Sequence, residues 1–183
     1  MKKVVPKNQA NRLLNCGMVV MVSCAYKDKA NITTCAWQMP LSKKPPAAAV
    51  ALDKDHFSSD LMRESEEFII NIPDWSILDQ VVKCGSWSGW NVDKFAETGL
   101  NSEKAHSLVN IPKVKECVGA LECAVFDIKD VGDHHLFFGE VISAEAEEDY
   151  FKEGFWDTRK VQFIFHLGSR YFFKSSEFIE VEK

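Results

Sequence analysis

The sequence predicts a mainly β protein, an antiparallel barrel with a few short helical insertions. Its apolar runs are short, rich in Val, Ile and Phe, and separated by turn residues, which is the pattern of barrel or sandwich strands. With 183 residues, the chain has the length of one domain that buries most of its unfolded surface in one core. We therefore expect a single domain over residues 1–183.

Eight segments carry the strand pattern. One of them is closed by Pro73, which lacks the backbone donor that a sheet ladder needs. The turn residues 129–133 join two of the longer segments and predict a β-hairpin. The expected strands are Met18 to Ala25, Asn31 to Trp37, Ala47 to Leu52, Phe68 to Ile72, Ala120 to Asp127, Leu136 to Ala144, Val161 to Leu167 and Tyr171 to Phe173.

Three short helices are expected between these strands. The first runs from Ser59 to Glu67. The second, Ser76 to Lys83, has an apolar stripe on one face, and Gly85 is expected to stop it in a left-handed conformation. The third, Val92 to Thr98, is expected to end at Gly99.

Charge and cysteine content exclude several classes of protein. A net charge of −5 provides no attraction to nucleic acid or to anionic lipid, so neither is expected as a partner. The apolar run at residues 17–24 is too short to cross a bilayer, and the basic start is followed by no signal-like stretch, which predicts a cytoplasmic protein. The six cysteines contain no CxxC pair and the five histidines no HExxH, so we expect reduced thiols and no metal site.

Three polar segments are candidates for binding chemistry. Residues 31–40 alternate as a β-strand does, and an ordinary strand explains their composition as well as a cofactor site does. Residues 53–59 lead a polar loop with a lysine and a histidine into a helix, which suits a phosphate dianion or simple helix capping. Residues 84–95 place glycines, hydroxyls and Lys94 in a loop before a short helix. The glycine spacing is not that of a Walker loop, so the segment is either another anion-contacting loop or only a turn.

Nine short motifs follow one another over nearly the whole chain. They are Asn31, Thr33 and Trp37 in N-x-T-x-x-x-W, Pro45-Pro46, His56-Phe57-Ser58, Glu67 to Pro73, Cys84-Gly85, Asp93-Lys94-Phe95, Gly132-Asp133-His134, Gly139-Glu140-Val141 and His166-Leu167-Gly168. Each motif is weak alone, but their joint order resembles the flavin reductase-like, flavoredoxin-type family of FMN-binding split barrels. One departure is Ser169, which stands where relatives usually have a second glycine.

The resemblance implies a Greek-key-like split β-barrel with FMN near the interface of a homodimer. It further implies an FMN-dependent oxidoreductase or electron carrier, supplied with electrons by NADH, NADPH or a redox protein. The implied cofactor contacts are Asn31, Ile32, Thr33, Thr34, Cys35, Ala36 and Trp37 at the isoalloxazine ring, Ala51, Leu52, Asp53 and Lys54 along the ribityl chain, His56, Ser58 and Lys94 at the phosphate, Cys84, Gly85, Ser88 and Gly89 nearby, His134 on the flavin face, and His166 in a loop that reaches the partner's site.

FMN carries the redox chemistry itself, so no catalytic triad is expected. Reduced flavin is anionic at its pyrimidine side, and a nearby Lys or His would stabilise it. Two alternatives stay open. One is a non-enzymatic FMN-binding module; the other is a haem-binding split barrel with His166 or His56 as an axial ligand. The sequence leaves the electron donor and acceptor open.

Overall fold

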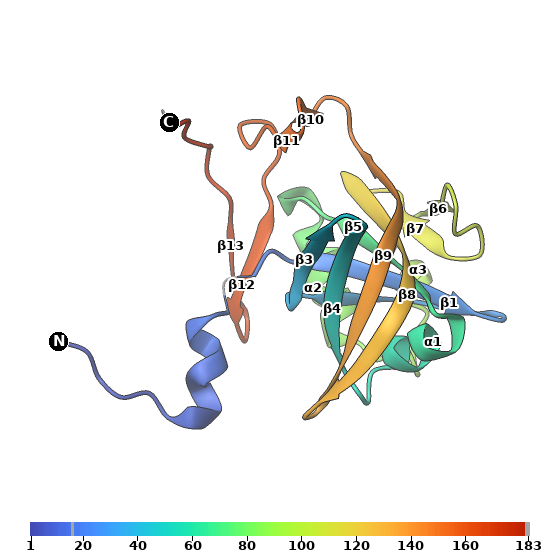
Figure 1. The fold of residues 1–183 in the computed structure, drawn as a ribbon, viewed down its shortest axis with the longest axis horizontal. Coiled ribbons are helices and arrows are strands. Elements are labelled where there is room, and N and C mark those ends of the chain that lie inside the picture. Colours follow the sequence, from blue (N-terminus) through green and yellow to red (C-terminus); the bar gives the residue numbers. More distant parts are fainter. Residues whose placement is uncertain (16, 182–183) are drawn as a thin grey trace.

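The computed structural model describes residues 1–15 and 17–181 and is dominated by one curved antiparallel sheet (Figure 1). Seven strands pair in the order β2-β1-β5-β8-β9-β4-β3, and each neighbouring pair is antiparallel. The mainly β, antiparallel prediction is therefore confirmed. The strands of this sheet are β1 Val20–Tyr26, β2 Lys29–Cys35, β3 Gln38–Lys43, β4 Pro46–Asp53, β5 Glu67–Ile72, β8 Gly119–Val131 and β9 His134–Ala146.

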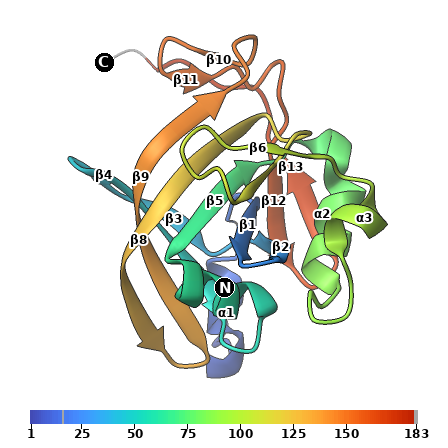
Figure 2. The same ribbon diagram turned by 90° about the vertical axis from the view of Figure 1, so that its right-hand side faces the viewer.

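The remaining elements surround this sheet. Figure 2 shows α2 beside the β12–β13 hairpin, and α1 below the curved sheet. Three smaller ladders pair β6 Ser102–Lys104 with β7 Pro112–Val114, β10 Phe151–Lys152 with β11 Phe155–Trp156, and β12 Ile164–Gly168 with β13 Tyr171–Lys174. The helices are the 3-10 helices η1 Lys7–Leu13 and η2 Trp75–Ile77 and the α-helices α1 Phe57–Ser65, α2 Leu78–Ser86 and α3 Lys94–Thr98. None of the helices in the described ranges is long and apolar enough to cross a bilayer.

Each predicted strand segment contains a strand, but the helix predictions need two corrections. The first helix ends at Ser65, and Glu67, its predicted last residue, begins β5. The prediction that Gly85 ends the second helix is wrong, because α2 continues to Ser86 and Gly85 lies inside it. A Cβ at Gly85 would lie 3.0 Å from the Cβ of Thr34, so the glycine permits close helix packing instead of a turn. The predicted stop at Gly99 is confirmed, with φ at +72°.

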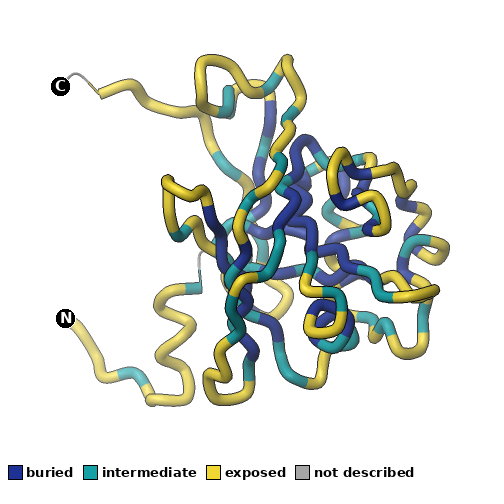
Figure 3. Tube along the Cα trace, turned by 45° about the vertical axis from the view of Figure 1, so that its right-hand side comes forward, coloured by how far each residue is buried: buried dark blue, intermediate teal, exposed yellow. Residues whose placement is uncertain are grey.

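The main core lies between the inner face of the sheet and α1. It includes Val50, Met62, Phe68 and Phe137, whose side chains are almost completely buried. Figure 3 shows this buried centre in dark blue, whereas both terminal segments are largely exposed. A Cβ at Gly139 would overlap the ring of Phe68, so this glycine allows the ring to pack against β9. Burial of each large apolar side chain contributes about 2 kcal/mol to stability.

A second core fixes α2 against the opposite face of β1 and β2. Met21, Ile32, Val81 and Cys84 are among its fully buried members. The hydroxyl of Thr34 on β2 donates a hydrogen bond of 2.5 Å to the carbonyl of Val81. This contact brings the last turn of α2 next to the carboxyl end of β2.

Glu122 on β8 is a buried carboxylate that holds the loop before β7. It accepts hydrogen bonds of 2.7 Å from the backbone N–H groups of His106, Ser107 and Leu108. Burial alone would raise the pKa of Glu122, but these three donors outweigh it and lower the pKa. The resulting stabilisation is present above the pKa of the unfolded chain and is lost as the pH falls through the lower folded pKa.

We expect Glu122→Gln to lower the free energy of unfolding near neutral pH by about 1–3 kcal/mol, because three N–H donors lose a charged acceptor. Urea unfolding near pH 7 and about pH 3.5 measures the effect, and the gap to the wild type should shrink at the lower pH. The exposed Glu148→Gln serves as the control and should show neither effect. A gap that is independent of pH would contradict the role of the ionised carboxylate.

Candidate functional site

Two adjoining cavities lie where β2 ends, beside α2 and the N-terminus of α1. The polar cavity has a volume of about 140 Å³, the open cavity about 290 Å³, and His56 lines both. The polar cavity is lined by Asn31, Thr33, Asp55, His56, Phe57, Gly85, Ser86, Trp87, Ser88, Gly89 and Lys94. The open cavity is lined by Asn11, Arg12, Asn15, Thr34, Cys35, Ala36, Trp37, Ala51, Leu52, Asp53, His56, His134, His166 and Ser169.

Lys94 is the buried cation of the polar cavity. It is the first residue of α3, whose start is capped by Asp93, and only 4% of it is exposed. Its Nζ donates a hydrogen bond of 2.6 Å to the carbonyl of Cys84. Burial lowers the pKa of Lys94, and within residues 1–15 and 17–181 no carboxylate forms an ion pair with it. A buried positive charge without a counterion costs free energy, and a bound anion would offset that cost.

Asn31 and His56 form the wall opposite the loop that contains Gly89. The side-chain amide of Asn31 donates to the hydroxyl of Ser58 at 2.9 Å, which fixes its orientation. A Cβ at Gly89 would overlap this amide, so the loop approaches β2 too closely for any larger residue. Burial lowers the pKa of His56, with the Asp53 carboxylate opposing that shift. The wall therefore presents polar groups with little excess charge of their own.

A stacked pair of rings borders the open cavity. Trp37 and His134 lie with their ring centroids 4.7 Å apart and an interplanar angle of 29°. The indole N–H of Trp37 donates to Asn15 Oδ1 at 3.2 Å, and His134 Nδ1 lies 2.6 Å from a carboxylate oxygen of Asp133. The planar surfaces make this cavity suitable for a flat aromatic group.

Most of the predicted contact residues line one of the two cavities. Four do not. Ile32 packs in the core beneath α2, and Lys54 pairs with Asp130 at 3.6 Å. Ser58 is buried in α1, and Cys84 contributes its backbone carbonyl to Lys94. These four support the walls of the cavities and do not line them.

Sequence reasoning missed the contribution of the N-terminal segment, residues 1–15. Asn11, Arg12 and Asn15 line the open cavity, and none of the side chains of η1 is buried. No hydrophobic periodicity or motif marks these positions, because their place depends on contacts with distant strands. The backbone N–H of His166 on β12 donates to the carbonyl of Gly17, which follows the segment.

The side chains at the site are suited to binding and less suited to nucleophilic or metal chemistry. Burial raises the pKa of Cys35 to about 11, so this thiol stays protonated at neutral pH. The five cysteines among the described residues are free thiols, and Cys16 lies outside those residues. Over the same ranges, no cluster of His, Cys, Asp and Glu is arranged to hold a metal ion.

Comparison with known proteins identifies the family. A family model described as the flavin reductase like domain matches residues 13–164. The chain belongs to this family. An uncharacterised protein of Archaeoglobus fulgidus is 33% identical over 155 residues, which cover 84% of this chain and 86% of that protein. The family resemblance expected from the sequence motifs is therefore confirmed.

Solved structures of flavin reductase-like proteins share the fold. Flavoredoxin of Desulfovibrio vulgaris (Miyazaki F) is 27% identical, with a TM-score of 0.85 and coverage of 99% of this chain and 97% of flavoredoxin. The FMN-binding domain of a flavin reductases-like enzyme from Shewanella baltica OS155 is 25% identical, with a TM-score of 0.82 and coverage of 98% and 97%.

We expect Lys94→Met to raise the free energy of unfolding of the ligand-free protein by about 1–2 kcal/mol near neutral pH, because it removes a buried charge that has no counterion. Since the folded pKa of Lys94 is lowered, the advantage of the variant should fade as the pH rises toward the usual lysine pKa. Urea unfolding measures both effects, with the exposed Lys115→Met as the control. A less stable Lys94→Met variant would show that the lysine is structural.

Proposed function

We propose that this protein binds FMN and acts as a flavoenzyme or electron carrier of the flavin reductase or flavoredoxin type. The observation that carries the proposal is the buried ammonium group of Lys94, which lines a polar cavity and has no carboxylate partner among the described residues. A phosphate monoester provides the missing negative charge. FMN has such a group at one end and a planar ring at the other.

The two cavities fit the two ends of FMN. Lys94, Ser88 and the Asn31 amide would contact the phosphate in the polar cavity, where charge-assisted hydrogen bonds are strongest. From there the ligand would pass His56, which both cavities share, into the open cavity. The Trp37–His134 pair would border the ring. The printed name of the Shewanella baltica neighbour, an FMN-binding domain, supports this choice of ligand.

The residues of the chain bind and orient; the bound flavin supplies hydride and single-electron chemistry. Trp37 and Ala51 line the cavity at the proposed ring position. His134, oriented by Asp133, would be a polar group beside the ring. No side chain has to act as a nucleophile, which agrees with the raised pKa of Cys35, about 11.

Equilibrium titration with FMN and with riboflavin, which lacks the phosphate, tests the assignment. We expect Lys94→Met to weaken FMN binding about tenfold to a hundredfold, because it removes a charge-assisted contact. Riboflavin binding should change little in the same variant. Lys115→Met, which removes an exposed lysine elsewhere, should leave both ligands unaffected. An equal loss for FMN and riboflavin would remove Lys94 from the phosphate site.

Anaerobic addition of NADH or NADPH to the FMN complex distinguishes an enzyme from a passive module. Bleaching of the flavin spectrum identifies an oxidoreductase that uses that donor. A spectrum that persists with both nucleotides favours a carrier supplied by another redox protein, or the non-enzymatic binding module. A Soret band in the purified protein would instead favour the haem-binding alternative.

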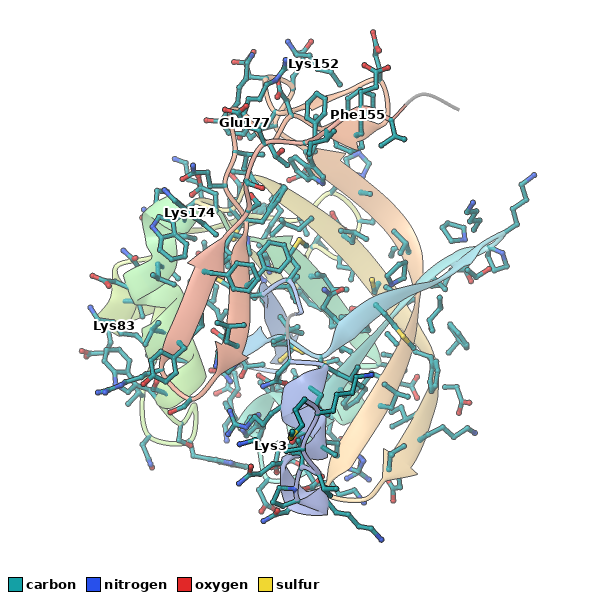
Figure 4. The ribbon with its side chains drawn as sticks, turned by 90° about the vertical axis from the view of Figure 1, so that its left-hand side faces the viewer. Lys3, Lys83, Lys152, Phe155, Lys174 and Glu177 are labelled. Atoms are coloured by element: carbon teal, nitrogen blue, oxygen red, sulfur yellow. The ribbon has the colours of Figure 1, made fainter. Side chains whose placement is uncertain are left out.

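We also propose that the protein is a homodimer. Figure 4 looks onto the face that contains the N-terminal segment and the β12–β13 hairpin, where Lys3 and Lys174 are labelled. Leu14 of the N-terminal segment, Leu167 of β12 and Tyr171 of β13 are exposed by 86%, 46% and 59%. Exposed apolar side chains on these elements support a protein contact. Light scattering at micromolar concentration tests the proposal, and a monomeric mass would contradict it.

A further inference from the structure

The open cavity has one permanently charged cation, Arg12, which the N-terminal segment places there. Within residues 1–15 and 17–181, no carboxylate forms an ion pair with its guanidinium. Lys54, the cation expected in this region from the sequence, pairs with Asp130 and lines neither cavity. The cationic group available to a ligand in the open cavity therefore comes from a different part of the chain.

Packing against the β12–β13 turn positions the Arg12 guanidinium. Gly168 adopts φ of +115°, and a Cβ at this residue would overlap the guanidinium. The absence of a side chain at Gly168 thus leaves the space that Arg12 occupies. Two backbone contacts, Val19 N–H to the Ile164 carbonyl at 2.8 Å and His166 N–H to the Gly17 carbonyl at 3.3 Å, connect β12 to the chain just after the segment.

The three histidines of the open cavity differ from Arg12, which has no ion-pair partner among the described residues. Nε2 of His166 lies 3.0 Å from the Ser169 carbonyl and donates to it. His134 Nδ1 already contacts the carboxylate of Asp133 at 2.6 Å. Burial lowers the pKa of His56, so its neutral form is favoured. Arg12 stays charged at every physiological pH.

We propose that Arg12 faces the pyrimidine end of bound FMN and binds the reduced, anionic form of the cofactor more tightly than the oxidised form. Lys94 and Arg12 would then serve opposite ends of the cavities. Lys94 contacts the phosphate, whose charge is the same in both redox states, whereas Arg12 meets the end at which charge develops on reduction. Arg12 would thereby raise the midpoint potential of the bound flavin. This inference rests on the proposed FMN site.

The exposed character of the N-terminal segment suits this role. Because η1 buries no side chain, the segment can move aside at small cost while FMN enters and then return over the ring. In the complex, the Arg12 guanidinium would lose part of its water shell, which strengthens its attraction to a developing negative charge.

The test compares the dissociation constants of oxidised and dithionite-reduced FMN under anaerobic conditions. We expect Arg12→Gln to weaken binding of reduced FMN about tenfold and to leave oxidised FMN within about twofold. A tenfold rise in the dissociation constant of reduced FMN relative to that of oxidised FMN corresponds to a midpoint potential about 30 mV lower for the two-electron couple. Arg12→Lys should restore part of the ratio. The control is Lys7→Gln, which removes the same charge from an exposed position of the same segment.

Four results would overturn the inference. Equal weakening of both redox forms in Arg12→Gln would reduce Arg12 to a general packing contact. An equal shift in Lys7→Gln would attribute the effect to the overall charge of the segment. If the wild type binds FMN but Arg12→Gln leaves the ratio of the two dissociation constants unchanged, the role of Arg12 is rejected and the proposed FMN site is not. Failure of the wild type to bind either form would reject the proposed function, and this inference with it.

Discussion

The candidate site depends on how closely α2 approaches β2. Gly85 allows the last turn of the helix to lie against Thr34, and the Thr34 hydroxyl fixes the distance through the Val81 carbonyl. That approach sets the position of the Cys84 carbonyl, which accepts the hydrogen bond of Lys94. A Cβ at Gly85 would crowd the Thr34 side chain at 3.0 Å and so press on this contact. Sheet packing, helix position and the buried cation are therefore linked through a few atoms.

Burial of the Lys94 ammonium group without a counterion among the described residues costs free energy, and folding alone does not require that cost. A single neutral acceptor, the Cys84 carbonyl, does not compensate a buried ammonium group, and the lowered pKa of Lys94 reports this imbalance. A core built only for stability would have an apolar side chain at this position, or a carboxylate beside the lysine. At the proposed phosphate site, the same imbalance would provide binding energy, because the ligand would supply the missing charge. The unpaired charge lowers the stability of the ligand-free protein and would raise its affinity for an anion.

Sequence patterns predicted the elements with local signals and missed the contacts made between distant segments. Alternating apolar residues located the strands, and Gly99 marked a helix end by its left-handed conformation. Gly85 gave the same local signal, although its real role is close packing against Thr34, which local sequence does not encode. The same limit explains Lys54. Its place in a polar loop suggested a ligand contact, but the partner, Asp130, lies in a hairpin far along the chain.

The N-terminal segment extends this point from single residues to a whole part of the site. Its composition is basic and it has no buried side chain, so neither periodicity nor hydropathy indicates a function. It becomes part of the site only because β12 pairs with the chain at Met18 and Gly17 and brings the Gly168 turn to Arg12. The rigid sheet and α2 thus position the polar cavity, while a weakly held segment completes the open cavity. This division would suit the proposed FMN site, because the segment that lines the open cavity buries none of its η1 side chains and could be displaced at small cost.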